Sequence, residues 1–266
     1  MTEAHGTPIA GTVIDDQPPD VTGEAAIAFG RAAWIGTVSG AGVGLLMGVL
    51  NRLVMRIVAL QNGPTDIETD FGAKVLNFTT EGTIGLIIVT TLVAVVPGML
   101  YVGLRRLIPG GTMISGLVFG LLLAATLGAA IVDSRLRDFR LLGVPQVSAA
   151  MFLGMFVLFG LLVAPVAARL DTRVSRTPSD RVFGGYLLVA ALMLLIGIQV
   201  VFKGPWSWLI LVPLGFAMAV SAGERTGARW TQDRRLVRVG GYLALAIPFA
   251  LGLIDLVGEL TLIAKA

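Results

Sequence analysis

The chain has 266 residues, of which 55% are hydrophobic and 14% are charged, and its mean hydropathy is +0.85. Soluble domains carry about 25% charged residues, so this composition excludes an ordinary soluble domain and indicates a membrane protein. The net charge of +3 arises from basic residues in short segments between apolar runs, which favours membrane orientation and not nucleic-acid binding. Cysteine is absent and the one histidine, His5, lies in a polar leader, so we predict no metal site and no cofactor.

Residues 1–25 are polar, acidic and proline-bearing, and they lack the basic and apolar regions of a signal peptide. We expect a disordered cytoplasmic tail there. Residues 26–266 contain repeated apolar runs close to the ~20 residues that cross a bilayer. They predict an all-α fold, a polytopic integral membrane protein with about seven transmembrane helices in one bundle. The predicted spans are 29–52, 83–104, 112–132, 146–167, 182–202, 206–222 and 238–260.

The loops between these spans predict the orientation of the bundle. With a cytoplasmic N-terminus and an outside C-terminus, 12 of the 20 Lys and Arg residues lie inside and 8 lie outside, which agrees with the positive-inside rule. The segment 133–140 opposes this assignment because it places three arginines outside. Only Lys203, Gly204 and Pro205 separate the fifth and sixth spans, which predicts a tight hairpin or, alternatively, one re-entrant unit. Arginine outnumbers lysine and Ala, Val and Gly are abundant, so we assign the chain to a bacterial plasma membrane.

A stripe of glycines marks the first span. Positions four apart share one helix face, so Gly36, Gly40, Gly44 and Gly48 form a groove, with Gly42 off to one side. Small residues at this spacing let a second backbone approach closely in lipid. Packing against another helix of the same chain is favoured, because six other helices are available. The alternative is a face for a homo-oligomer or for a membrane partner protein.

Ionisable residues gather at the predicted outer half of the bundle. They are Arg52 and Arg56 in the first span, Glu81 at the start of the second, and Asp255 and Glu259 in the last. Asp255 lies about 20 Å along its helix from Tyr242, which places it inside a core ~30 Å thick. A carboxylate at that depth needs a partner or water, and the two arginines are the candidates. The cluster is interpreted either as salt bridges that hold the bundle together or as a vestibule for an ion, proton or polar ligand.

The sequence offers little support for catalysis. No predicted span contains a histidine to serve as the base of a serine protease, no Walker-type glycine loop is present, and no residue is assigned a catalytic role. We therefore expect a non-enzymatic multi-pass protein with a transport-like role for a small solute or ion. The alternative is a membrane scaffold or a subunit of a larger assembly that packs through the glycine stripe. The third hypothesis is a carboxylate-dependent enzyme that acts on lipid-linked substrates.

Overall fold

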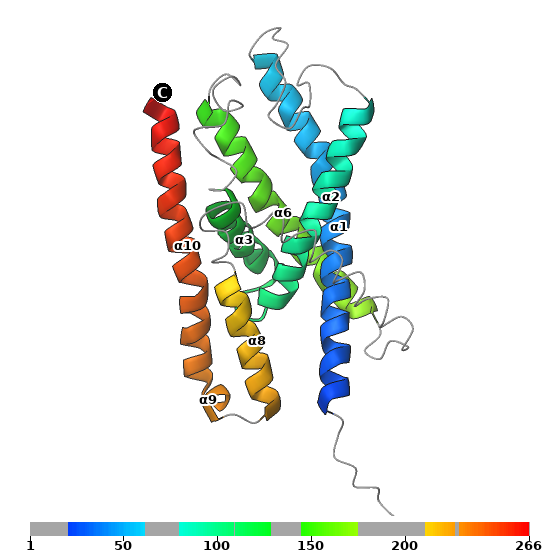
Figure 1. Cartoon of the computed structure of the whole chain (residues 1–266), viewed down its shortest axis with the longest axis vertical. Coiled ribbons are helices and arrows are strands. Elements are labelled where there is room, and N and C mark those ends of the chain that lie inside the picture. Colours follow the sequence, from blue (N-terminus) through cyan, green and yellow to red (C-terminus); the bar gives the residue numbers. More distant parts are fainter. Residues whose placement is uncertain are drawn as a thin grey trace, which may run out of the picture.

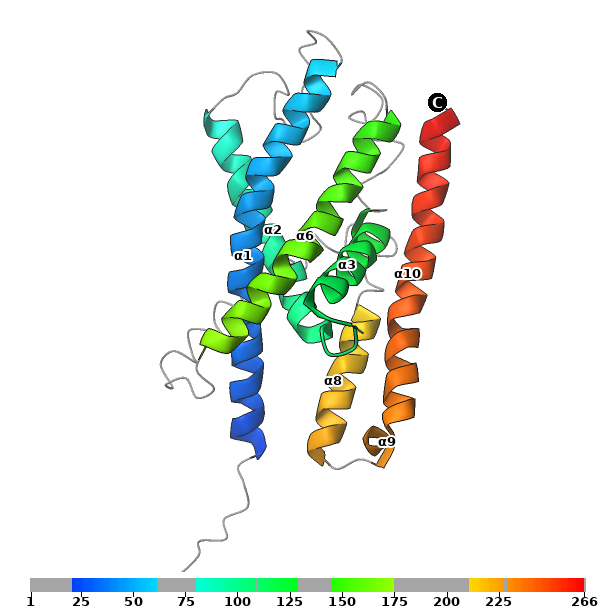
Figure 2. The same cartoon turned by 180° about the vertical axis from the view of Figure 1, so that it is seen from behind.

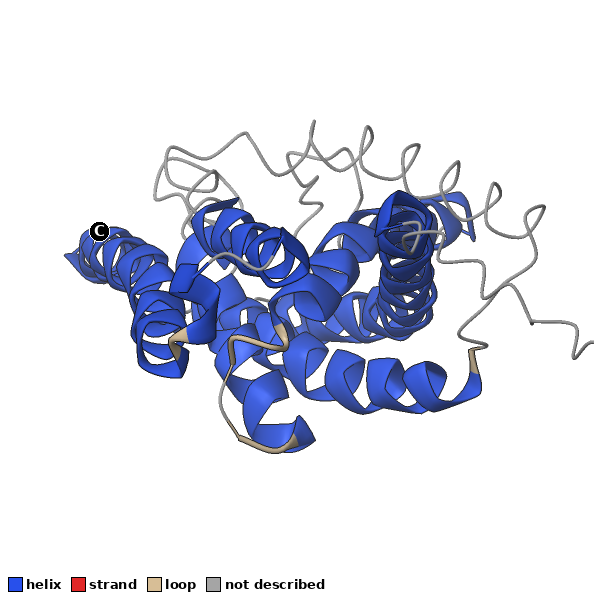
Figure 3. Ribbon diagram, turned by 90° about the horizontal axis from the view of Figure 1, so that it is seen from below, coloured by secondary structure: helices blue, strands red, loops and turns tan. Residues whose placement is uncertain are grey.

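The computed structural model describes residues 21–61, 80–108, 110–128, 145–174, 211–226 and 229–265. These residues form helices and short turns, and none of them belongs to a β-strand (Figure 3). The all-helical fold class is therefore confirmed for this part of the chain. The predicted tail up to residue 20, the polar segment 62–79 and the fifth predicted span at 182–202 lie outside the described residues. Residues 21–25, which the sequence assigned to the tail, are the first residues of a helix.

The helices are α1 (Val21–Gln61), α2 (Thr80–Leu104), α3 (Thr112–Leu123), α6 (Pro145–Arg173), α8 (Leu211–Thr226), α9 (Arg229–Gln232) and α10 (Arg234–Lys265), and the π-helical turn η1 (Ala124–Gly128) continues α3. Among the described residues, four segments are long and apolar enough to cross a membrane. They are Ile27–Ile57, Gly82–Leu104, Ala150–Arg173 and Arg235–Leu262, and they overlap the first, second, fourth and seventh predicted spans. The third predicted span coincides with the shorter apolar helix Thr112–Gly128. The count of seven spans stays a prediction.

The composition of α2 shows why apolar segments of this chain are helical. This helix is rich in Ile, Val and Thr, which have a lower helix propensity than Ala or Leu in water. In apolar surroundings the backbone must satisfy its own hydrogen bonds, and a single helix does so within one segment. The hydroxyl of Thr91 likewise donates to the carbonyl oxygen of Ile87, one turn earlier, at 2.7 Å. The polar side chain is thus satisfied inside the helix.

The glycine stripe of α1 lies against α2. A methyl group added at Gly36 would lie 2.6 Å from Cα of Met99, and one at Gly40 would lie 2.6 Å from the carbonyl oxygen of Ala94. An added methyl at Gly48 would lie 2.9 Å from Cα of Ile87. Three of the four contacts are therefore with backbone atoms, and the contact of Gly44 is with the side chain of Ala94 and the backbone of Thr91 and Thr90. Nothing lies within 4 Å of a methyl group at Gly42, so the close approach is confined to one face.

A second backbone crossing joins α3 and α6. A methyl group at Gly116 would lie 2.6 Å from the carbonyl oxygen of Gly160, and one at Gly120 would lie 2.7 Å from Cα of Val157. Gly160 makes the reciprocal contact, because a methyl group there would meet the carbonyl oxygen of Gly116 and the backbone of Gly120. This pair was not predicted from the sequence. Its signals are the four-residue spacings of Gly116 and Gly120 on α3 and of Gly160 and Ala164 on α6.

The two crossings organise the bundle into two helix pairs. Helices α1 and α2 form one pair, α3 and α6 form the other, and α6 also packs against α1. Figures 1 and 2 show α6 running diagonally, with its first half between α1 and α10 and its end crossing α1. Helix α10 packs against α8, η1 and α6. We call the end at which α1 begins and α2 and α6 finish the arginine end. It is the lower end in Figure 1, where α8 also finishes and α10 begins.

Large apolar side chains also cover much of the outside of the helices. Ile254 is 69% exposed, Met113 is 61% exposed and Leu45 is 55% exposed. Further exposed residues of this kind on α10 alone are Leu236, Val239, Leu243, Ile247, Leu251, Leu253, Val257 and Leu262. Isolated exposed apolar residues are normal on a soluble protein, but contiguous apolar surface indicates contact with a membrane or a partner.

Candidate functional site

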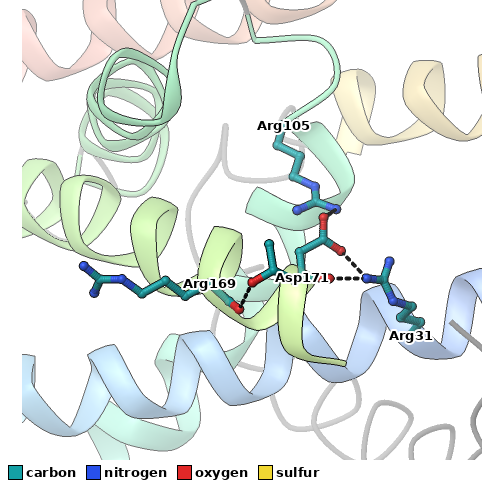
Figure 4. Close-up of polar contacts among 5 residues, drawn as sticks. Arg31, Arg105, Arg169 and Asp171 are labelled. Atoms are coloured by element: carbon teal, nitrogen blue, oxygen red, sulfur yellow. Dashed lines mark hydrogen bonds and ion pairs between the residues drawn. The ribbon is translucent and has the colours of Figure 1, made fainter. Parts of the chain in front are cut away.

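Three helices meet in an ion-pair cluster at the arginine end, which we call the Asp171 cluster and which consists of Arg31, Arg105 and Asp171. Nη2 of Arg31 lies 2.8 Å from Oδ1 of Asp171, and Nη2 of Arg105 lies 3.0 Å from Oδ2 of the same carboxylate. Figure 4 shows the two guanidinium groups reaching Asp171 from different sides. One carboxylate of α6 is therefore shared by an arginine of α1 and an arginine that directly follows α2.

Helix ends explain why the cluster forms at this place. The last carbonyl groups of an α-helix lack partners within the helix and carry partial negative charge. Arg31 donates a hydrogen bond to one of them, the main-chain carbonyl oxygen of Asp171 in the last turn of α6. The hydroxyl of Thr172 donates to another, the carbonyl oxygen of Arg169, at 2.8 Å. The side chain of Arg169 points away from Asp171 (Figure 4), so it takes no part in the cluster.

The cluster is only partly accessible to solvent. The exposed fractions of the side chains are 21% for Arg31, 26% for Arg105 and 30% for Asp171. At this burial, ion pairs are screened less by salt than fully exposed pairs are. The three side chains sum to one excess positive charge, because two guanidinium groups share a single carboxylate. The Asp171 cluster therefore favours a further negative group nearby.

A pocket of about 180 Å³ lies beside this cluster, lined by Tyr101, Arg105, Gly110, Thr112, Ser115, Ala164 and Ala168. The hydroxyls of Tyr101 and Ser115 are 2.9 Å apart, and Ser115 also donates to the carbonyl oxygen of Thr112 at 2.9 Å. Because serine has a single hydroxyl proton, this second bond makes Tyr101 the donor to Ser115. The ring of Tyr101 is fixed by an edge-to-face contact with Phe119, with ring centroids 5.2 Å apart. One wall of the pocket is thus formed by the hydrogen-bonded hydroxyls of Tyr101 and Ser115 and the carbonyl oxygen of Thr112.

Asp171 was not predicted from the sequence as a site residue. Arg31, Arg105 and Arg169 were counted among the residues that indicate membrane orientation. The signal that could have identified the cluster is local, since Asp171 is an isolated acid between Arg169 and Arg173 at the end of an apolar helix. Such an acid is placed to pair with arginines from neighbouring helices.

The residues predicted to form the outer cluster lie at the opposite end from Asp171. Arg52 of α1 is buried, with 4% of its surface exposed, whereas Arg56 is exposed. Asp255 of α10 is half-buried. The side chains of Glu81 and Glu259 lie outside the described part of the structure. Figures 1 and 2 show α6 between the later halves of α1 and α10, and the pairing of Asp255 with Arg52 or Arg56 stays a prediction.

Asp255 lies one helical turn from an unusual backbone contact. A methyl group at Gly252 would lie 2.7 Å from the carbonyl carbon of Ala125 and 3.1 Å from the main-chain nitrogen of Thr126, both in the π-helical turn η1. Residues three apart are neighbours on a helix surface, so Asp255 shares a face with Gly252. Thr126 is 1% exposed, and its hydroxyl donates to the carbonyl oxygen of Leu122 at 2.8 Å. Single π-helical turns occur often at functional sites.

Within the described ranges, no group of three or more His, Cys, Asp or Glu residues is arranged to hold a metal ion. Comparisons with protein-family models, with curated proteins and with solved structures find no match for this chain. Two regions of the described structure are therefore candidate functional sites. They are the Asp171 cluster with its pocket and the surroundings of Asp255.

Proposed function

We propose that the chain is a multi-pass protein of a bacterial plasma membrane. Four described segments of spanning length and the exposed apolar side chains of α1, α3 and α10 support this proposal, because lipid would cover surface that water leaves unfavourably exposed. The proposal keeps the seven spans, the cytoplasmic N-terminus and the outside C-terminus predicted from hydropathy and loop charge. In this orientation the arginine end faces the cytoplasm.

The function that we propose is transport of a small ion or solute. The observation that carries it is the half-buried carboxylate of Asp255 in a spanning helix, one turn from the point where α10 contacts the π-helical turn η1. Ionisable groups inside spanning helices are costly and mark ion or proton pathways or interhelical pairs. Irregular backbone at membrane depth is tolerated where it lines protein or a cavity. The combination of the two features in one place favours a pathway.

The scaffold alternative relies on the glycine stripe as a docking face. In the structure the backbone of α2 fills that groove, so a partner helix would have to displace α2 before it could pack there. This contact favours internal packing as the role of the stripe, and transport remains the preferred proposal. The third hypothesis, a carboxylate-dependent enzyme, would need a second carboxylate near Asp255, and Glu259, four residues later, is the candidate in the sequence.

Flux through proteoliposomes tests the transport proposal. The purified chain is reconstituted with the pH-sensitive dye pyranine inside the vesicles, and proton flux is recorded under imposed gradients of Na⁺, K⁺ or membrane potential. We expect flux above that of protein-free vesicles, and we expect Asp255→Asn to abolish it while the protein still reconstitutes. Glu224→Gln is the matched control, because Glu224 is an exposed acid on α8. Flux that is unchanged in Asp255→Asn contradicts the assignment of the pathway to Asp255, and flux that is absent with the unmodified chain contradicts proton-coupled transport.

A further inference from the structure

We propose that the pocket beside Arg105 binds a phosphate group, and that this group belongs to the headgroup of an anionic phospholipid. The pocket lies where the chain leaves α2, turns through Gly110 and Gly111, and enters α3, with Ala164 and Ala168 of α6 as its far wall. This proposal is separate from transport, because it concerns the arginine end and not the surroundings of Asp255.

The charge of the region favours an anion. Arg31 and Arg105 share the single carboxylate of Asp171, which leaves one excess positive charge in a partly buried cluster. Burying an uncompensated charge is costly, so a bound anion would be stabilising at this point. None of the pocket-lining residues that the structure describes carries a carboxylate. An anion in the pocket would therefore be attracted by Arg105, and no carboxylate of these lining residues would repel it.

Arg105 has donors left for such an anion. A guanidinium group has five N–H donors in a planar fork, and the structure assigns one hydrogen bond, from Nη2 to Oδ2 of Asp171. The geometry of this fork suits the oxygens of a phosphate group. Arg105 also lines the pocket itself. It can thus contact Asp171 on one side and a phosphate oxygen on the other.

The start of α3 adds to the positive potential of the pocket. Gly111 precedes the helix in an extended conformation (φ −75°, ψ 174°), and no side chain caps the first turn. The first N–H groups of a helix have no partner within it and favour negative ligands. Gly110 takes the left-handed conformation with φ +99°, which a residue with a side chain rarely adopts. The turn that leads the chain to the pocket therefore depends on glycine.

The size and the surroundings of the pocket point to a lipid headgroup. A volume of about 180 Å³ is well above the ~10–15 Å³ that a cavity needs to hold one water molecule, so the pocket can accommodate a phosphate group. Met113 and Ile114 directly follow the pocket residue Thr112 and are 61% and 57% exposed. Acyl chains could lie along this apolar surface of α3 while the phosphate occupies the pocket. A free phosphate would gain nothing from it.

Lipid-dependent stabilisation tests this proposal. The full chain is purified in a neutral detergent, and its melting temperature is followed during titration with phosphatidylglycerol, phosphatidylcholine or inorganic phosphate. We expect phosphatidylglycerol to raise the melting temperature most. Arg105→Gln should weaken the apparent affinity for it about tenfold or more, because a charge-assisted hydrogen bond is lost. Ala168→Leu should have a similar effect, because the larger side chain fills the pocket and leaves every charge in place.

The matched control is Arg106→Gln, which removes the same charge from the exposed neighbour of Arg105 and should leave the lipid response unchanged. An equal loss in Arg106→Gln would indicate diffuse attraction and overturn the site. Retention of the full response in either Arg105→Gln or Ala168→Leu would also overturn it, so one folded variant is sufficient for a decision. A response to inorganic phosphate as strong as that to phosphatidylglycerol would overturn the assignment to a lipid. None of these outcomes depends on ion flux.

Discussion

Replacing Gly40 by alanine adds one methyl group at the crossing of α1 and α2, where backbone faces backbone. That methyl group would lie 2.6 Å from the carbonyl oxygen of Ala94, 2.9 Å from Cα of Val95 and 3.1 Å from Cα of Gly98. Carbon atoms in favourable contact are about 3.5–4.0 Å apart, so the two helices would have to separate by roughly 1 Å. No side chain can rotate away to relieve the contact, because the neighbours are main-chain atoms.

The size of the effect follows from two opposing contributions. Inserting a methyl group into a well-packed core costs about 1–3 kcal/mol, and replacing glycine by alanine within a helix gains about 0.5–1 kcal/mol. We therefore expect Gly40→Ala to lower the free energy of unfolding by about 1–2 kcal/mol. Gly42→Ala has the same helical gain, but its methyl group has nothing within 4 Å. The control should be neutral or slightly stabilising.

The assay is thermal or denaturant unfolding of both variants in one detergent, followed by tryptophan fluorescence. The difference between the two variants isolates the packing contribution, because the intrinsic helical gain cancels. Equal stabilities for Gly40→Ala and Gly42→Ala would refute the backbone crossing as the reason for the glycine stripe. Gly42→Ala as the less stable variant would refute it more strongly still.

Two other predictions concern the Asp171 cluster and the orientation of the bundle. Asp171→Asn keeps the shape of the side chain but leaves two arginines without their shared carboxylate, so the free energy of unfolding in detergent should fall by about 1–3 kcal/mol. This loss should be smaller at high salt. The control Arg169→Gln should stay within about 0.5 kcal/mol of the unmodified chain. A destabilisation no larger than that of Arg169→Gln would contradict the cluster. The other prediction tests the orientation by labelling single cysteines, which is specific because the chain has no cysteine of its own. In intact cells, Thr172→Cys should be protected from an impermeant thiol reagent and Gln61→Cys should react. The reverse pattern would show that the orientation is inverted.

Hydropathy predicted the four described helices that are long and apolar enough to span a membrane. A run of apolar residues must satisfy its backbone internally, so length and composition are enough to find α1, α2, α6 and α10. The π-helical turn η1 could not be predicted in this way, because the sequence of Ala124–Gly128 is as apolar as its surroundings. What distinguishes it is the contact of Gly252 with Ala125, which depends on the position of another helix.

The site was harder to predict than the fold. The four-residue spacing identified one face of α1, but small residues do not specify which helix will occupy the groove. The partner positions on α2, Ala94 and Gly98, are also four residues apart, but one such pair does not specify the helix that it contacts. The Asp171 cluster joins residues 31, 105 and 171, which are far apart in the chain, and a count of loop charges treats each arginine separately. Only the packing of α6 against α1 and α2 brings these charges together.

The two glycine crossings also determine where this bundle can deform. Helices in direct backbone contact have few side chains between them that could rearrange, so we expect α1 with α2 and α3 with α6 each to move as one body. Relative motion would then occur mainly at the contact between the α1–α2 pair and the α3–α6 pair. Arg31 and Arg105 belong to the first body and Asp171 belongs to the second. A single carboxylate therefore links the two bodies at the arginine end, and we expect its removal to favour motion of one helix pair against the other.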